Sequence, residues 1–230
     1  MNTQTPSADL QDRLFGSLDP DSIQAFQEII AASKDIMSCY RCAIMEVETK
    51  FRVLNERFSL LHDRNPIESI HNRLKSPDSI REKMIRKNLP FTMEAIEDNI
   101  FDIAGVRVIC SFTDDIYMLA DCLLQQDDIR LIQQKDYIRN PKKNGYRSLH
   151  LIVEVPIFLQ NGKKLMKVEV QLRTLAMEFW ANLEHQLRYK KDLPAEVVEK
   201  TEAQLYECAR LSSVLDAKMQ DIKDTIEACS

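Results

Sequence analysis

The stretch Val168-Glu169-Val170-Gln171-Leu172-Arg173 alternates strictly between apolar and polar side chains. Successive side chains of a β-strand point to opposite faces of its sheet, so this pattern predicts a strand with one apolar face and one polar face. We place the strand at 164–173, and the Asn161-Gly162 dipeptide before it is typical of a hairpin turn. Three long polar side chains would then share one face of a central strand. A solvated sheet surface explains a single such residue, so the interpretation depends on which other polar residues reach this face.

Three more segments have the composition and alternation of strands: 106–112, 129–134 and 149–155. Apolar residues at helical spacing predict a helix over 114–126, capped by Asp114 and Asp115, and another over 175–189, capped by Thr174. This mixture of elements predicts an α+β fold, in which helices pack on a small mixed β-sheet.

Both ends of the chain are predicted to be helical. A long helix should begin at Asp19-Pro20, and apolar residues at alternating steps of four and three form a seam from Tyr40 to Leu61. A similar seam with more small and polar residues runs from Val198 to Ile226. The seams could pack on each other, on the central region or on a second copy of the chain. The expected parts are a mobile tail at 1–18, a helical segment at 19–66, a central domain at 67–191 and a C-terminal helix at 192–230.

Charge is distributed unevenly along the chain. Of the 230 residues, 44% are hydrophobic and 29% are charged, and the net charge is −5. Six basic residues and two acidic ones lie in 73–87, and six basic residues and one acidic one lie in 130–150. Two basic islands in an acidic protein favour binding of a compact anion such as a polyphosphate, and they disfavour a broad DNA-binding surface.

Several classes of protein are excluded by absent patterns. The sequence has neither the glycine-rich P-loop pattern nor the dinucleotide-binding pattern. It contains no apolar run of the ~18 residues that a membrane span needs, and residues 1–12 lack the features of a signal peptide. The six cysteines are scattered, which is typical of reduced thiols. We therefore expect a cytoplasmic protein with no membrane partner.

Two carboxylates are the candidates for catalysis and metal binding. Asp102 lies just before the strand at 106–112, Arg107 lies within that strand, and Glu169 lies on the polar face of the strand at 164–173. Two carboxylates from neighbouring strands are the minimal oxygen ligands for Mg²⁺, which completes its shell with water and phosphate.

The basic islands supply candidate contacts for phosphates and for a base. Lys75, Ser79 and Lys83 are spaced by four, which would align them on one helical face toward a phosphate chain. In the second island, residues 141–145 have turn chemistry with free lysines, and Tyr146 offers a ring on which a base can stack. For a lone tyrosine, a place in the core is the simpler interpretation.

A set of short motifs follows in order along the central region: 102–107, 142–150, 168–174, Phe179-Trp180 and Glu184-His185. With this set, the sequence over about 67–191 closely resembles the synthetase domain of the RelA/SpoT family of alarmone enzymes. The resemblance implies a nucleotidyltransferase-like fold and a GTP diphosphokinase that serves the stringent response. Such an enzyme moves pyrophosphate from ATP to the ribose 3′-hydroxyl of GDP or GTP, giving AMP and ppGpp or pppGpp.

The short chain resembles the small members of this family, which have the synthetase domain without a hydrolase domain and typically form homotetramers. The resemblance also implies roles for individual residues. Asp102 and Glu169 would bind Mg²⁺, and Glu169 would act as general base toward the 3′-hydroxyl. The residues that would bind ATP are Arg73, Lys75, Ser79, Lys83 and Arg107. The residues that would bind GDP or GTP are Lys142, Asn144, Tyr146, His150 and Gln171, with the ring of Tyr146 stacked on guanine.

Two other functions stay open from the sequence. A relative of the family could pyrophosphorylate the 3′ end of tRNA, but that acceptor favours a larger basic surface than this acidic chain offers. A non-catalytic module could bind nucleotides on a degenerate synthetase fold, but Asp102 and Glu169 are both present.

Overall fold

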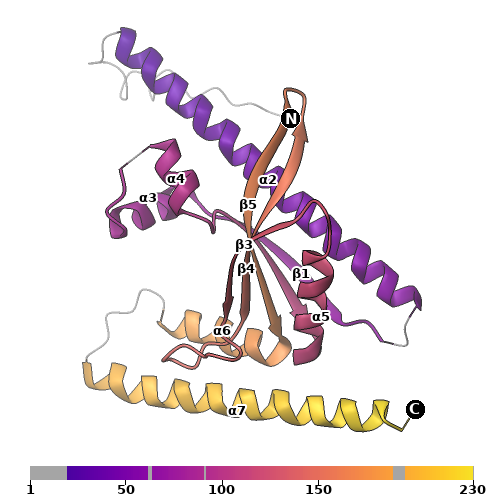
Figure 1. The fold of residues 1–230 in the computed structure, drawn as a ribbon. Coiled ribbons are helices and arrows are strands. Elements are labelled where there is room, and N and C mark those ends of the chain that lie inside the picture. The colour runs from indigo at the N-terminus through magenta and orange to yellow at the C-terminus, as the bar shows by residue number, and fades with distance from the viewer. Residues whose placement is uncertain (1–19, 62–63, 91, 189–194, 230) are drawn as a thin grey trace, which may run out of the picture. The chain divides into compact units, whose positions relative to one another are not determined.

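The computed structural model of the protein describes residues 20–61, 64–90, 92–188 and 195–229 (Figure 1). The tail expected at 1–18 and the expected cap Asp19 lie outside these ranges. The chain divides into two units, Met1–Cys39 and Tyr40–Ser230, and the boundary falls inside helix α2 (Pro20–Leu61). The described part of the first unit is the beginning of this helix. The sheet, the other helices and the site all belong to the second unit.

A five-stranded sheet forms the centre of the second unit. Its strands are β1 (Ile67–Leu74), β2 (Ala104–Cys110), β3 (Arg130–Asp136), β4 (Leu149–Leu159) and β5 (Gly162–Thr174). The strand order is β1-β2-β5-β4-β3, in which β2 and β5 run parallel and the other neighbours are antiparallel. The predicted α+β fold is confirmed, and β5 is a central strand as its pattern indicates.

All four predicted strands are present, whereas β1 was not predicted. It is an edge strand, and of its eight residues only Ile67 is buried, so it lacks the alternation that marks the others. The predicted hairpin joins β4 and β5 through residues 160–161, with Gly162 at φ +122° and paired with Leu159. Phe112 was predicted at the end of a strand but instead precedes a helix, because the carboxylate of Asp115 accepts a hydrogen bond from its N–H at 3.1 Å.

The remaining described helices are α3 (Pro77–Arg86), α4 (Met93–Asn99), α5 (Thr113–Leu124), α6 (Leu175–Arg188) and α7 (Ala195–Glu227). The two central helices that the sequence predicts are α5 and α6. Thr174 caps α6 as expected, because its hydroxyl oxygen accepts a hydrogen bond from the N–H of Met177 at 3.1 Å. Among the described residues, no helix has the length and apolar content needed to span a membrane.

The sheet has an apolar face and a polar face. On the apolar face, Val168, Val170 and Leu172 of β5 have no exposed surface. α5 contacts β2 and β5. Its predicted apolar stripe is buried, each residue at most 4% exposed: Ile116, Leu119, Ala120 and Leu123. The apolar face therefore forms the core, which leaves the polar face for the site.

The two predicted seams differ in burial. Four seam residues of α2 are at most 4% exposed, so this part of the seam packs within the chain: Tyr40, Ile44, Val47 and Phe51. Four apolar seam residues of α7 are between 46% and 61% exposed: Leu215, Met219, Ile222 and Ile226. The inward side of α7 instead carries Ala209 and Asp216, which are buried. These four residues of the C-terminal seam are therefore not part of an intramolecular core.

Candidate active site

The sheet register gathers the polar residues of four strands on one face. Arg73 of β1 and Glu169 of β5 both pair with the same residue of β2, so they lie in one row of the sheet. In the next row, Arg107 of β2 pairs with Gln171 of β5, which also pairs with His150 of β4. Residues far apart in the sequence meet here because β5 lies between β2 and β4.

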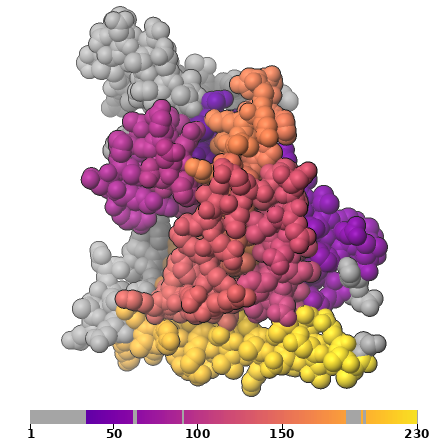
Figure 2. Space-filling view, viewed as in Figure 1, coloured from indigo at the N-terminus to yellow at the C-terminus, as the bar shows by residue number. Residues whose placement is uncertain are grey.

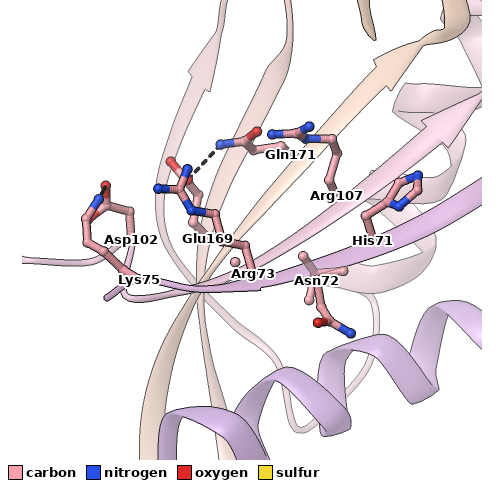
Figure 3. A pocket seen from close by; sticks show the side chains of 10 residues that line it. His71, Asn72, Arg73, Lys75, Asp102, Arg107, Glu169 and Gln171 are labelled. Carbon is pink, nitrogen blue, oxygen red and sulfur yellow. Dashed lines mark hydrogen bonds and ion pairs between the residues drawn. The ribbon is translucent and has the colours of Figure 1, made fainter. Parts of the chain in front are cut away.

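A cavity of about 380 Å³ opens over these rows, lined in part by His71 and Asn72 of β1 (Figure 3). Six of the predicted site residues line it: Arg73, Lys75, Asp102, Arg107, Glu169 and Gln171. The lining thus combines carboxylates with cationic side chains. This combination suits a polyphosphate that is held together with a metal ion.

Asp102 is held by two lysines through one of its oxygens. Its Oδ2 lies 2.9 Å from the ammonium of Lys75 and 2.7 Å from the ammonium of Lys83. Burial alone raises the pKa of Asp102, but the hydrogen bonds from Lys83 and Lys75 outweigh burial and hold this pKa below its usual value. Its Oδ1 is buried and has no hydrogen-bond partner in the described part of the chain.

Glu169 is held by an amide and an imidazole in place of lysines. Its Oε2 accepts a hydrogen bond from Gln171 Nε2 at 2.8 Å, and its Oε1 lies 3.3 Å from Nδ1 of His150. Burial raises the pKa of Glu169, but His150 and Gln171 outweigh burial and lower it. The negative charge of Asp102 also raises this pKa, which shows that the two carboxylates are close enough to interact.

Asp102 and Glu169 have the donor chemistry that a divalent cation requires. Among the described residues, Asp102 Oδ1 is a buried oxygen without a hydrogen-bond partner, and Glu169 is an ionised oxygen ligand that lines the same cavity. Within the described residues, no cluster of three or more His, Cys, Asp or Glu side chains could hold a metal ion. A metal here would therefore be bound by two protein carboxylates, which is the usual arrangement for Mg²⁺ that also binds phosphate.

Lys75, Ser79 and Lys83 do not share a helical face, so that prediction is wrong. Lys75 lies between β1 and α3, because Pro77 occupies the first turn of α3 and Ser76 caps it. The Oγ of Ser76 accepts a hydrogen bond from the N–H of Ser79 at 3.3 Å. The two lysines nevertheless converge, since both ammonium groups reach the same carboxylate.

Apart from Gln171, the predicted contacts for the guanosine nucleotide form a second group, which His150 connects to Glu169. The hydroxyl of Tyr146 lies 2.8 Å from Nε2 of His150. The ammonium of Lys142 lies 4.6 Å from the centre of the Tyr146 ring, and Asn144 Oδ1 accepts a hydrogen bond from the N–H of Tyr146 at 3.2 Å. Tyr146 also packs against a buried cluster on α6 and α7, so its ring has a core contact as well as a position beside His150.

The loop that carries Tyr146 is anchored on α7. Arg147 forms an ion pair with Asp216. Gly145 has φ +87°, and a Cβ added to it would collide with the side chain of Ala209. Glycine is therefore required by the backbone conformation and by the close approach to α7. Figure 2 shows the surface of α7, in yellow, directly below the central part of the molecule.

Two charged residues of this site were not among the predicted ones. Arg173, near the end of β5, is 5% exposed and donates a hydrogen bond to the hydroxyl of Tyr146 at 2.6 Å. Glu178, in the first turn of α6, accepts from Arg107 at 2.8 Å and from Arg173 at 2.7 Å. Arg173 is visible in the alternating stretch as its third polar residue. No local signal marks Glu178, because its partners lie on two strands.

Comparison with known proteins identifies the class to which this fold and site belong. Residues 72–193, more than half of the chain, match the family described as "Region found in RelA / SpoT proteins". The chain belongs to the RelA/SpoT family. It is 43% identical to GTP pyrophosphokinase YwaC of Bacillus subtilis (strain 168) over 196 residues, which are 84% of this chain and 91% of that protein.

Two crystal structures of small alarmone synthetase 1 from Bacillus subtilis have the same fold. The structure bound to its product pppGpp is 36% identical, with a TM-score of 0.77, and the match covers 86% of this chain and 99% of that chain. The structure bound to AMPCPP is 33% identical, with a TM-score of 0.72, and the match covers 86% and 98% of the two chains. The fold that the sequence resemblance implies is confirmed.

Proposed function

We propose that the protein is a (p)ppGpp synthetase, which transfers pyrophosphate from ATP to the 3′-hydroxyl of GDP or GTP. The observation that carries this proposal is the cavity in which Asp102 and Glu169 face the cations of Arg73, Lys75 and Arg107. The relatives support it, because YwaC is named a GTP pyrophosphokinase and small alarmone synthetase 1 has been solved with pppGpp and with AMPCPP. These ligands correspond to the acceptor product and to the ATP donor.

The chemistry of the step matches the residues of the cavity. The 3′-oxygen of the acceptor forms a bond to the β-phosphorus of ATP, the bond from that phosphorus to the α,β-bridging oxygen breaks, and AMP leaves. The proton of the 3′-hydroxyl passes to the carboxylate of Glu169. Phosphoryl-type transfer depends mainly on positioning and charge neutralisation. Arg73, Lys75 and Arg107 supply positive charge on the donor side of the cavity.

We also propose Mg²⁺ as the metal, held by Asp102 and Glu169. When bound, it neutralises phosphate charge. Asp102→Asn should lower turnover and raise the Mg²⁺ concentration that gives half the maximal rate, because one ligand of a hard cation loses its charge. A Mg²⁺ titration of the rate checks this, and an unchanged midpoint contradicts the metal assignment.

The direct test is transfer of labelled phosphate. Purified protein is mixed with Mg²⁺, ATP labelled at the γ-phosphate and GDP or GTP, and the nucleotides are separated by chromatography. We expect labelled ppGpp or pppGpp together with AMP. The matched control acceptor is 3′-deoxy-GDP, which lacks the attacking hydroxyl and should give no product.

A second arm of the experiment offers tRNA in place of the guanosine nucleotide. Label that appears in tRNA and not in GDP or GTP would support the alternative acceptor. Folded protein that transfers label to none of these acceptors would contradict the enzymatic function and favour a non-catalytic nucleotide-binding module.

The exposed apolar surface of α6 and α7 suggests assembly, and we propose a homotetramer. On α6, Leu175 is 55% exposed and Phe179 is 67% exposed. Together with Leu211, Leu215 and Met219 of α7, they line a groove of about 940 Å³. Monomeric proteins rarely leave a contiguous apolar patch of this kind in water. We place the enzyme in the cytoplasm and in the stringent response, since its proposed substrates are free ATP and GTP or GDP.

A further inference from the structure

Arg173 is a buried cation in a closed ring of hydrogen-bonding side chains. Its Nη2 donates to the hydroxyl of Tyr146 at 2.6 Å and to Oε1 of Gln171 at 3.0 Å. On one side of the ring, Gln171 Nε2 donates to Oε2 of Glu169 at 2.8 Å. On the other side, the Tyr146 hydroxyl lies 2.8 Å from Nε2 of His150, whose Nδ1 lies 3.3 Å from Oε1 of Glu169. Both sides start at Arg173 and end on Glu169.

The chemistry of Arg173 gives this ring one direction. A guanidinium donates hydrogen bonds and cannot accept them. Gln171 must therefore turn its carbonyl oxygen toward Arg173, which leaves its NH₂ group for Glu169. The hydroxyl of Tyr146 must accept from Arg173, and it can then donate its own proton to Nε2 of His150. A neutral His150 then carries its proton on Nδ1, the nitrogen that faces Glu169.

We propose that Arg173 is the positioning residue of Glu169. By setting the amide orientation of Gln171 and the tautomer of His150, it directs one hydrogen-bond donor at each oxygen of the carboxylate. This inference rests on the proposed function, in which Glu169 is the general base. An amide and an imidazole thus fix the orientation of the carboxylate.

Glu178 extends the same arrangement to the ATP side of the site. Its Oε2 accepts from Nη1 of Arg173 at 2.7 Å, and its Oε1 accepts from Nη1 of Arg107 at 2.8 Å. Arg107 lines the cavity, whereas Arg173 is only 5% exposed and is not one of its lining residues. The carboxylate of Glu178 thus fixes two guanidinium groups. That of Arg173 positions the base Glu169, and that of Arg107 is expected to bind ATP.

Replacing Arg173 by a residue that can also accept hydrogen bonds removes the direction of the ring. Gln171 can then turn its carbonyl oxygen toward Glu169, and His150 can move its proton to Nε2. In either case an oxygen or a nitrogen lone pair faces the carboxylate and repels it. Replacement by lysine, which only donates, preserves the direction as far as its shorter reach allows.

The first test needs no substitution. In protein labelled with ¹⁵N at histidine, the imidazole ¹⁵N shifts report which ring nitrogen carries the proton, and a spectrum of His150→Gln identifies the signals of His150. At a pH where His150 is neutral, we expect the Nδ1–H tautomer. Finding the Nε2–H tautomer overturns the proposal, and this measurement does not depend on any enzymatic activity.

The second test compares Arg173→Gln with Arg173→Lys. Loss of a residue that orients a catalytic group typically costs about 10–100-fold in activity. We expect Arg173→Gln to lower kcat by at least about tenfold, to change KM for ATP by less than about threefold and to shift His150 away from the Nδ1–H tautomer. Arg173→Lys should keep the tautomer and recover part of kcat. The matched control is Arg210→Gln, which removes an exposed Arg–Glu pair on α7 and should change none of these values.

The outcomes separate this inference from the proposed function. Wild-type protein that transfers no pyrophosphate refutes the function, while the tautomer of His150 still tests the ring. Active protein in which Arg173→Gln retains both kcat and the tautomer refutes the role of Arg173. If Arg173→Gln does not fold, as its melting curve would show, the wild-type tautomer and the Arg173→Lys kinetics decide.

Discussion

Asp102 and Glu169 line one cavity but differ in the charge of their neighbours. Asp102 contacts two lysine ammonium groups, whereas Glu169 contacts an amide and an imidazole. Lysines can exchange a carboxylate for a phosphate, which would release Asp102 for a metal ion when ATP binds. The amide of Gln171 and the imidazole of His150 fix the orientation of the Glu169 carboxylate. The two carboxylates are therefore suited to different tasks.

Glu169→Gln should retain the fold and lower turnover by at least about a hundredfold, because an amide of the same shape can neither take a proton nor bind a hard cation. Rates of pyrophosphate transfer and a melting curve check this. Glu207→Gln, on the exposed side of α7, is the matched control and should keep the wild-type rate. Near-normal turnover of Glu169→Gln would refute the assignment of the base.

The lowered pKa of Glu178 predicts how the stability of the fold depends on pH. Burial raises the pKa of Glu178, but the charges of Arg173 and Arg107 outweigh burial, so this pKa is lower in the folded protein than in the unfolded chain. The ion pairs therefore stabilise the fold above the ordinary glutamate pKa of about 4.3, and this stabilisation is lost as pH falls through the lowered pKa.

The melting temperature of the wild type should exceed that of Glu178→Gln at neutral pH, and the gap should close as pH falls below about 4. Melting curves of both proteins across this range provide the measurement. Glu56→Gln, at an exposed position of α2, should show no such convergence with the wild type. Parallel curves for the wild type and Glu178→Gln would contradict the role of this carboxylate.

At the scale of single residues, the sequence predicts the position of a side chain where its neighbours are close to it in the chain. Alternation alone places Glu169, Gln171 and Arg173 on one face, and the register confirms it. The ring that joins them to Tyr146 and His150 is not visible, because it depends on the distance between β5 and the loop before β4. Hydrogen bonds across strands leave no periodic signal in the chain.

At the scale of helices and strands, the sequence predicts those segments in which buried apolar residues recur at a regular spacing. β2, β4 and β5 and helices α5 and α6 each bury one regular face, and all of them were predicted. β1 lies at the edge of the sheet with mostly exposed residues, so burial sets no apolar period in it. β3, at the other edge, also has no buried residue, and it was predicted without such a period. The missing period of β1 also explains the error at Lys75, which was assigned to a helix although it follows this unpredicted strand.

Tyr146, in the loop between β3 and β4, gives a prediction about binding of the acceptor nucleotide. Stacking of a base on an aromatic ring is worth roughly 1–3 kcal/mol, so Tyr146→Ala should raise KM for the guanosine nucleotide by about five- to a hundredfold. KM for ATP should barely change, because the proposed ATP contacts are Arg73 and Arg107. Titrations of the rate with each nucleotide provide the measurement.

Tyr146→Phe is the matched control for this prediction. It keeps the ring and removes the hydroxyl that contacts Arg173 and His150, so KM for the acceptor should stay near the wild-type value while kcat falls. Equal losses for both nucleotides in Tyr146→Ala would contradict separate sites. Unchanged KM values would leave Tyr146 with only its core contact.

For the whole molecule, the prediction of assembly rests on the unburied apolar side of α7 and the adjoining side of α6. Light scattering at micromolar concentration should give a mass well above the 26.7 kDa of one chain, about four times that mass for a homotetramer. Leu215→Arg should lower the mass, because it places a charge in a surface that is proposed to be buried. A 26.7 kDa species in the wild type would refute assembly.

Asp221→Arg is the matched control for assembly. It introduces the same side chain into the same helix at an exposed position outside the apolar groove, so the mass should stay that of the wild type. Equal effects of both substitutions would show that added charge, and not the apolar surface, controls the mass.

The contact between Gly145 and Ala209 offers a way to engineer the enzyme without altering any residue proposed to meet a nucleotide. Ala209 lies on α7, outside the cavity, yet the loop passes so close that Gly145 has no room for a Cβ. A larger side chain at 209 must therefore displace the loop or the helix. A graded series of substitutions from alanine through serine to valine would shift the acceptor loop in small increments, so that substrate preference could be tuned by volume alone.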